Sequence, residues 1–168
     1  MIPVVSIIGH HDAGKTRLLA ALIAELTDRG LRVGAVKHAP HLEIAAADGA
    51  DSERLRAAGA AHVLLLARDA AVLTTPPPSA ERLFEAIQRS FADACELVLV
   101  EGFKTGPFPK IEVFRRAGRV PQEPLAGALD VVAVITADDA GLPDGVPVFS
   151  PTEVERIADF IETRFLTG

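Results

Sequence analysis

The stretch from Val4 to Leu19 constrains this chain more than any other, because it places an apolar run, a glycine-containing octet and the start of a helical pattern in succession. The octet, residues 9–16, reads GHHDAGKT and fits the phosphate-binding pattern G-x-x-x-x-G-K-[ST] in its required strand, loop and helix context. Glycines at positions 9 and 14 let the chain curl with its N–H groups inward, and the following helix adds the positive end of its dipole. The stretch therefore predicts a site for nucleotide phosphates.

The residue types in this loop fit separate parts of a nucleotide. Lys15 would reach the β- and γ-phosphates, and the Thr16 hydroxyl would bind Mg²⁺. Arg17 either adds a cation near the α-phosphate or points into solvent. The predicted nucleotide-binding residues are Gly9, His10, His11, Asp12, Ala13, Gly14, Lys15, Thr16 and Arg17.

The rest of the chain alternates apolar strand patterns with amphipathic helix patterns. A helix over residues 15–29 and a strand over 32–37 complete a right-handed βαβ unit with the first strand. Alternation of this kind predicts an α/β fold, a P-loop NTPase-like and mainly parallel β-sheet flanked by helices on both faces. The 168 residues fit a single nucleotide-binding domain over 1–168. Further strands are expected at 62–67, 70–73, 97–100, 110–114, 131–135 and 146–149, and further helices at 81–94 and 152–165.

Two acidic residues are candidates for the chemistry beside the loop. Glu101 follows the apolar LVLV, so its carboxylate would emerge at the carboxyl end of a buried strand, where an acid can hold Mg²⁺ or orient an attacking water. Asp51 lies in a polar stretch that could approach the metal, although Asp51 or Ser52 as the N-cap of a short helix is an equal alternative. We predict Thr16, Glu101 and Asp51 as metal ligands, with Lys15 and Glu101 as catalytic residues.

Metal and base specificity stay open at this level. Four histidines, at positions 10, 11, 38 and 41, lie in or near loops at this edge but match no compact metal motif, and His62 is expected to be structural. The guanine-reading segment N-K-x-D is absent. Residues 136–139, TADD, could supply the acid that accepts from guanine N1–H and its amino group, although an ordinary Asp-rich turn explains them equally well.

Composition excludes several function classes. The net charge of −6 argues against a surface that binds nucleic acid. Cys95 is the only cysteine, so one chain forms neither a disulfide nor a thiolate metal cage. The apolar N-terminus has no basic segment before it, and no apolar run reaches membrane-spanning length, so we expect neither a signal peptide nor a membrane span. A cytoplasmic location is the simplest expectation.

Three further blocks carry a family resemblance. The blocks are VGAVKHAPH at 33–41, DGADSERLRAAGA at 48–60 and LVLVEGFKTGPFPKIEVFRR at 97–116. Together with the loop, they resemble the MobB family of adapter proteins in molybdopterin-guanine dinucleotide biosynthesis. The resemblance implies a GTP-binding, usually dimeric protein with weak hydrolysis. It also implies that the protein assists the guanylyltransferase that joins GMP to molybdopterin. At positions 50 and 17 this chain has Ala and Arg where the family commonly has Lys and Thr.

Beyond GTP and Mg²⁺, the expected partners are the guanylyltransferase, molybdopterin or its guanine dinucleotide, and a second copy of the chain. The chain would be a weak GTPase at most, because no arginine finger or water-orienting Gln is placed by motif. The strand over 110–114, expected nearer a sheet edge, is with its flanking loops a candidate for self-association. A metal-insertion type GTPase and a small-molecule P-loop kinase remain alternatives. Four basic residues that follow Glu101 could bind a second anion such as the pterin phosphate: Lys104, Lys110, Arg115 and Arg116.

Overall fold

The computed structural model describes residues 1–39, 49–79, 82–116, 123–138 and 141–166. The chain forms two compact units, one made of Met1–His38 with Ile87–Gly168 and the other of Ala39–Ala86. The single domain expected over 1–168 stays a prediction. No helix in the described ranges is long and apolar enough to cross a membrane.

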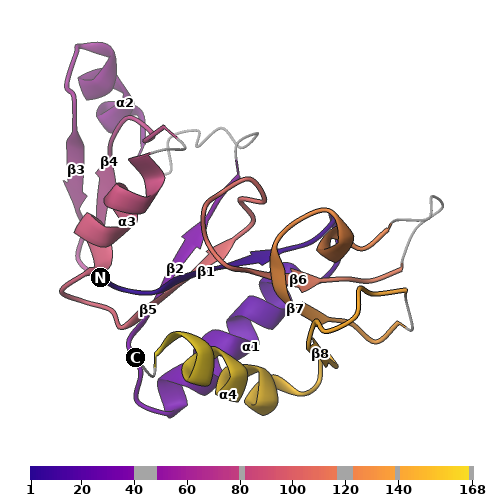
Figure 1. The fold of residues 1–168 in the computed structure, drawn as a ribbon. Coiled ribbons are helices and arrows are strands. Elements are labelled where there is room, and N and C mark those ends of the chain that lie inside the picture. The colour runs from indigo at the N-terminus through magenta and orange to yellow at the C-terminus, as the bar shows by residue number, and fades with distance from the viewer. Residues whose placement is uncertain (40–48, 80–81, 117–122, 139–140, 167–168) are drawn as a thin grey trace. The chain divides into compact units, whose positions relative to one another are not determined.

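The first unit is built on a six-stranded sheet with the order β2-β5-β1-β6-β7-β8, and every neighbouring pair is parallel (Figure 1). Because all strands point the same way, their carboxyl ends meet at one edge of the sheet, where ligands bind in open α/β folds. The α/β prediction is therefore confirmed. The strands are β1 (Val4–Ile8), β2 (Val33–Lys37), β5 (Leu97–Glu101), β6 (Lys110–Val113), β7 (Val131–Ile135) and β8 (Val148–Phe149).

Two helices, α1 (Lys15–Asp28) and α4 (Val154–Phe165), pack together on one face of this sheet (Figure 1). Strand side chains alternate between faces, so every second residue of β1 and β5 points to these helices. The largest buried cluster of the unit results, and it includes Val5, Ile7, Leu22, Leu26, Leu97, Leu99, Ile157 and Ile161. Apolar residues on the other alternation fill the opposite face, which is why the strands read as continuous apolar runs.

The opposite face is covered by shorter segments. The 3₁₀ turn η2 (Leu125–Gly127) and its flanking residues pack against Ile8, Phe114 and Val134. At the other end of the sheet, the ring of Phe91, the last residue of α3 (Leu83–Phe91), lies on Gly34 of β2. A Cβ at position 34 would stand 2.6 Å from that ring, so glycine permits the close approach.

The strand over 110–114 differs from its prediction. β6 is interior, paired with β1 on one side and β7 on the other, and all its residues are buried. The prediction of an edge position was wrong. The charged residues Lys110 and Glu112 gave the strand the alternating pattern of a half-exposed one, whereas both side chains are buried and hydrogen-bonded. Since neither edge of β6 is unpaired, a second copy cannot pair with an edge of this strand, and self-association through its flanking loops stays a prediction.

The second unit holds α2 (Gly49–Ala57) and an antiparallel hairpin of β3 (Val63–Leu66) and β4 (Ala71–Thr74). The hairpin is a sheet of its own and not part of the parallel one. Its strands are antiparallel because a connection this short can join only antiparallel strands. Helix α2 begins at Gly49, so Asp51 and Ser52 lie in its first turn and neither is its N-cap. The N-cap prediction for these residues was wrong.

Candidate functional site

The predicted phosphate loop joins β1 to α1 at the carboxyl edge of the sheet. Gly9 and Gly14 have φ values of +151° and +99°, and Asp12 between them has φ of +56°. These positive values are the reason that glycine occupies the two positions, because a Cβ is strained there. The first-turn N–H groups of α1 have no acceptor within the helix, so they point out as donors for an anion.

Lys15 folds back over the loop that precedes it. Its ammonium donates to the carbonyl of His10 at 2.6 Å and to that of Gly9 at 3.3 Å. Burial lowers the pKa of Lys15, and the charge of Glu101 partly opposes this shift. The charges of Lys104 and Lys37 lower the pKa further, which indicates that three ammonium groups share this region.

Glu101 is the acidic centre of the site. Its Oε1 accepts a hydrogen bond of 2.8 Å from the Thr16 hydroxyl, and its Oε2 lies 3.8 Å from the ammonium of Lys37. Parallel pairing explains this arrangement, since Lys37 and Glu101 are the last residues of β2 and β5 and stand opposite each other in register. The Glu101 side chain is only 12% exposed, so its carboxylate is largely enclosed by the groups around it.

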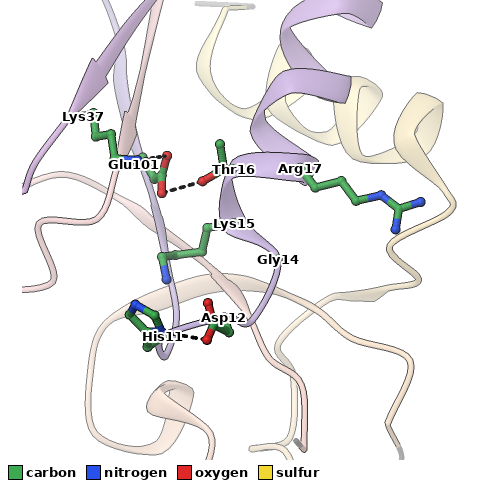
Figure 2. A pocket seen from close by; sticks show the side chains of 8 residues that line it. All are labelled: His11, Asp12, Gly14, Lys15, Thr16, Arg17, Lys37 and Glu101. Carbon is green, nitrogen blue, oxygen red and sulfur yellow. Dashed lines mark hydrogen bonds and ion pairs between the residues drawn. The ribbon is translucent and has the colours of Figure 1, made fainter.

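A cavity of about 400 Å³ surrounds these groups, and most of the predicted nucleotide-binding residues line it. Figure 2 shows Lys37 and Glu101 at one side and Arg17 pointing away from them at the other. His11 Nδ1 lies 2.9 Å from a carboxylate oxygen of Asp12 at the exposed tip of the loop. The full lining is His11, Asp12, Gly14, Lys15, Thr16, Arg17, Lys37 and Glu101.

A second cavity of about 620 Å³ shares Gly14 and Arg17 with the first. It lies between α1, the carboxyl ends of β6 and β7, and the start of α4, and apolar residues such as Val113 and Phe114 form much of its wall. Asp138 also lines it, from the segment expected to supply a base-reading acid. The Asp138 carboxylate accepts from the N–H of Arg116 at 2.5 Å, and Thr136 Oγ1 accepts from the N–H of Asp138 at 2.9 Å. Asp139 lies outside the described residues.

A buried carboxylate that sequence reasoning missed supports the loop from behind. Glu112 is fully buried in β6, and its two oxygens accept from the N–H groups of Leu125 and Ala126, each at 2.8 Å. The same segment reaches the phosphate loop, because His10 Nε2 donates to the carbonyl of Glu123 at 3.0 Å. No sequence signal could have indicated this, since the partners of Glu112 are backbone groups 13 and 14 residues away.

The remaining candidates have other partners or belong to the second unit. Asp51 pairs with Arg54 at 3.1 Å in α2 of the second unit, and its metal-binding role stays a prediction. Within the described part of the chain, no three His, Cys, Asp or Glu side chains gather as a metal site would require. His38 stacks at 4.6 Å on Phe103, and His41 lies outside the described residues. His62, expected to be structural, is exposed.

Lys110, expected among the basic residues for a second anion, has a structural role. Its side chain is buried, and its ammonium donates to the carbonyls of Gly106 and Phe108 at 2.9 and 3.0 Å. A buried ammonium tied to carbonyls cannot present itself to a ligand, so that expectation was wrong for this residue. Arg115 and Arg116 are exposed.

Comparisons with known proteins give one consistent result. A family model described as "Molybdopterin guanine dinucleotide synthesis protein B", MobB, matches residues 4–137. Molybdopterin-guanine dinucleotide biosynthesis adapter proteins of Haemophilus influenzae and Escherichia coli are each 36% identical over 164 residues, which cover 96% of this chain and 88% and 92% of theirs. A crystal structure of Bacillus subtilis MobB aligns with a TM-score of 0.74 at 23% identity, over 99% of this chain and 100% of that one. The last likeness shows a shared fold.

Proposed function

The chain belongs to the MobB family of molybdopterin guanine dinucleotide synthesis proteins, and from this premise we propose that it binds GTP with Mg²⁺ and serves as an adapter in the synthesis of that dinucleotide. The observation that carries the nucleotide part is the convergence of Lys15, Thr16 and Glu101 on one cavity beside a glycine-shaped loop. Lys15 supplies a cation for the phosphates, and the Thr16 hydroxyl and the Glu101 carboxylate each supply an oxygen ligand for a metal.

The oxygen donors in the first cavity fit Mg²⁺. This ion prefers oxygen ligands and keeps several waters, so it needs few protein groups beside the phosphates. Thr16 Oγ1 and the Glu101 carboxylate, joined at 2.8 Å, are the groups that would hold it directly or through water. The metal would neutralise charge that develops on the phosphates, while Lys15 would leave its carbonyl partners to bind them. Asp51 is a third proposed ligand.

The second cavity supports guanine as the base. It is concave and largely apolar with a few polar groups, which is the usual composition of a base or cofactor site. Guanine presents N1–H and its amino group as neighbouring donors, and the Asp138 carboxylate is an acceptor for both, whereas adenine presents an acceptor at N1. We propose that the phosphates lie in the first cavity and the base in the second, with Arg17 between them.

The adapter role assigns guanylyl transfer to a partner enzyme. No described residue near Glu101 is a glutamine that could orient water, so hydrolysis by this chain would be slow. We propose that the GTP-bound protein docks on the guanylyltransferase, in the cytoplasm, and assists the handling of molybdopterin or its guanine dinucleotide.

We also propose a homodimer, with the β3–β4 hairpin as its contact surface. Leu64, Leu66 and Leu73 share one face of the hairpin and are 57%, 74% and 60% exposed. An isolated two-stranded hairpin is marginally stable in water, so a second copy of the same face would bury the leucines and stabilise it.

Calorimetric titration of GTP and ATP with Mg²⁺ tests the nucleotide proposal. Lys15→Ala should weaken GTP binding about 30-fold or more, because losing a buried charge partner costs about 2–5 kcal/mol. Arg32→Ala is the matched control, since Arg32 precedes β2 at the opposite edge of the sheet and pairs there with Glu96 at 3.9 Å. Equal affinity of the wild-type protein and Lys15→Ala for GTP would refute the phosphate site, and a preference for ATP would refute guanine recognition.

A further inference from the structure

Lys37 is a cation in the phosphate cavity to which the loop motif gives no role. It ends β2, and its ammonium lies 3.8 Å from Glu101 Oε2 on the side of the carboxylate away from Arg17 (Figure 2). The Lys37 side chain is 62% exposed. Its ammonium is therefore held by one long ion pair at the mouth of the cavity, and such exposed pairs are weak.

The ion pair between Lys37 and Glu101 depends on the charge that Glu101 carries. A Mg²⁺ ion bound beside Thr16 and Glu101 would bring two positive charges next to the same carboxylate. That ion would repel the Lys37 ammonium and weaken its attraction to Oε2. The flexible stem of lysine would then let the ammonium turn to another anion within reach.

The order of groups across the two cavities identifies that anion. The second cavity shares Gly14 and Arg17 with the first, so the proposed placement of the base in the second cavity puts the nucleoside end of the nucleotide on the Arg17 side. Figure 2 places Lys37 on the other side of Lys15 and Thr16, beside Glu101. The phosphate chain therefore runs from Arg17 towards Lys37, and its last phosphate comes closest to Lys37.

We propose that Lys37 binds the terminal phosphate of a nucleoside triphosphate and leaves Glu101 when Mg²⁺ arrives with the nucleotide. This inference rests on the proposed nucleotide function. A diphosphate, even when it arrives with Mg²⁺, lacks the group that Lys37 would contact, so the Lys37 ammonium gains no new anion when a diphosphate is bound. Lys37 thereby makes the protein prefer triphosphate over diphosphate, which lets a partner distinguish the loaded from the spent adapter.

The experiment measures GTP and GDP affinities, each with Mg²⁺, for the wild-type protein and for Lys37→Met, Lys37→Arg and Arg32→Met. Lys37→Met should weaken GTP binding about tenfold, as expected for loss of a hydrogen bond to a charged group, and change GDP binding less than about twofold. Lys37→Arg should restore most of the GTP affinity because it keeps the charge. Arg32→Met also removes one positive charge, but Arg32 stands just before β2 whereas Lys37 ends that strand. This control should leave both the GTP and the GDP affinity unchanged.

Two outcomes would overturn the inference. An unchanged ratio of GTP to GDP affinity in Lys37→Met, whether both affinities fall or neither does, would show that Lys37 does not contact the terminal phosphate. A failure of Lys37→Arg to restore GTP affinity would show that the charge is not what matters. Either result leaves the proposed function standing, provided that the wild-type protein binds GTP and Lys15→Ala binds it much more weakly. Absence of GTP binding by the wild-type protein refutes the proposed function itself.

Discussion

Alanine at Gly9 should destabilise the protein more than alanine at Gly14, although both glycines belong to the same loop and both have positive φ. A Cβ at position 9 would lie 2.3 Å from the carbonyl oxygen of Val113 and 3.3 Å from its carbonyl carbon. Val113 ends β6, which is paired on both sides, so its backbone cannot move away cheaply. A Cβ at position 14 meets no atom within 4 Å.

The two costs follow from these contacts. An L-residue forced into a left-handed conformation costs about 1–2 kcal/mol, and this is the whole expected effect of Gly14→Ala. Gly9→Ala adds an overpacking cost of about 1–3 kcal/mol, so its total is about 2–5 kcal/mol. At about 2–4 °C per kcal/mol for a chain of this size, the melting temperatures of the two variants should differ by roughly 2–12 °C.

Urea unfolding followed by circular dichroism measures the difference in unfolding free energy between the two variants. The urea concentrations at the midpoints are compared, provided that the dependence of the unfolding free energy on urea is the same for both variants. Gly30→Ala is the matched control, because Gly30 follows α1 with φ of +91° and open space where a Cβ would stand. It should lose the same stability as Gly14→Ala but keep nucleotide affinity. A stability loss in Gly14→Ala equal to or larger than that in Gly9→Ala would refute the argument from the Val113 contact.

Two other predictions concern the contacts of acidic residues in and just before α4. Arg29, after α1, makes ion pairs of 2.6 to 2.8 Å with three carboxylates of α1 and α4, so Arg29→Ala should lower the free energy of unfolding by about 1 kcal/mol, and 1 M salt should shrink that loss. The pKa of Glu153 lies below its usual value because the N–H of Ser150 donates to its carboxylate at 2.7 Å and Arg156 adds a further hydrogen bond. A lowered carboxyl pKa stabilises the fold above the unfolded pKa, about 4.3, and the benefit disappears as pH falls through the folded pKa. Thermal melts of Glu153→Gln should therefore show a deficit at pH 7 that vanishes at acid pH, and a deficit of constant size would contradict this.

Local signals in the sequence were enough to predict the phosphate loop and the elements on either side of it. Glycines at positions 9 and 14, the apolar run before them and the helical period after them are local signals, and the structure places the loop between β1 and α1 as expected. The family resemblance, which depends on short blocks spread over the chain, is likewise confirmed. Most element bounds were predicted within a few residues, because apolar runs and helical periods are set by neighbours along the chain.

Tertiary structure decided how these elements meet. The sequence pattern could not reveal that β6 lies between β1 and β7, or that Glu112 is buried against the backbone of η2. It also could not bring Lys37 to Glu101, since these residues are far apart in the chain and meet only through the register of β2 with β5. Strand order and register depend on contacts between distant segments that bury apolar area and satisfy buried polar groups together. No local pattern contains that sum. For this reason the loop and Glu101, at the end of its apolar strand, could be predicted from sequence, while the pairing of Glu101 with Lys37 and the burial of Glu112 could not.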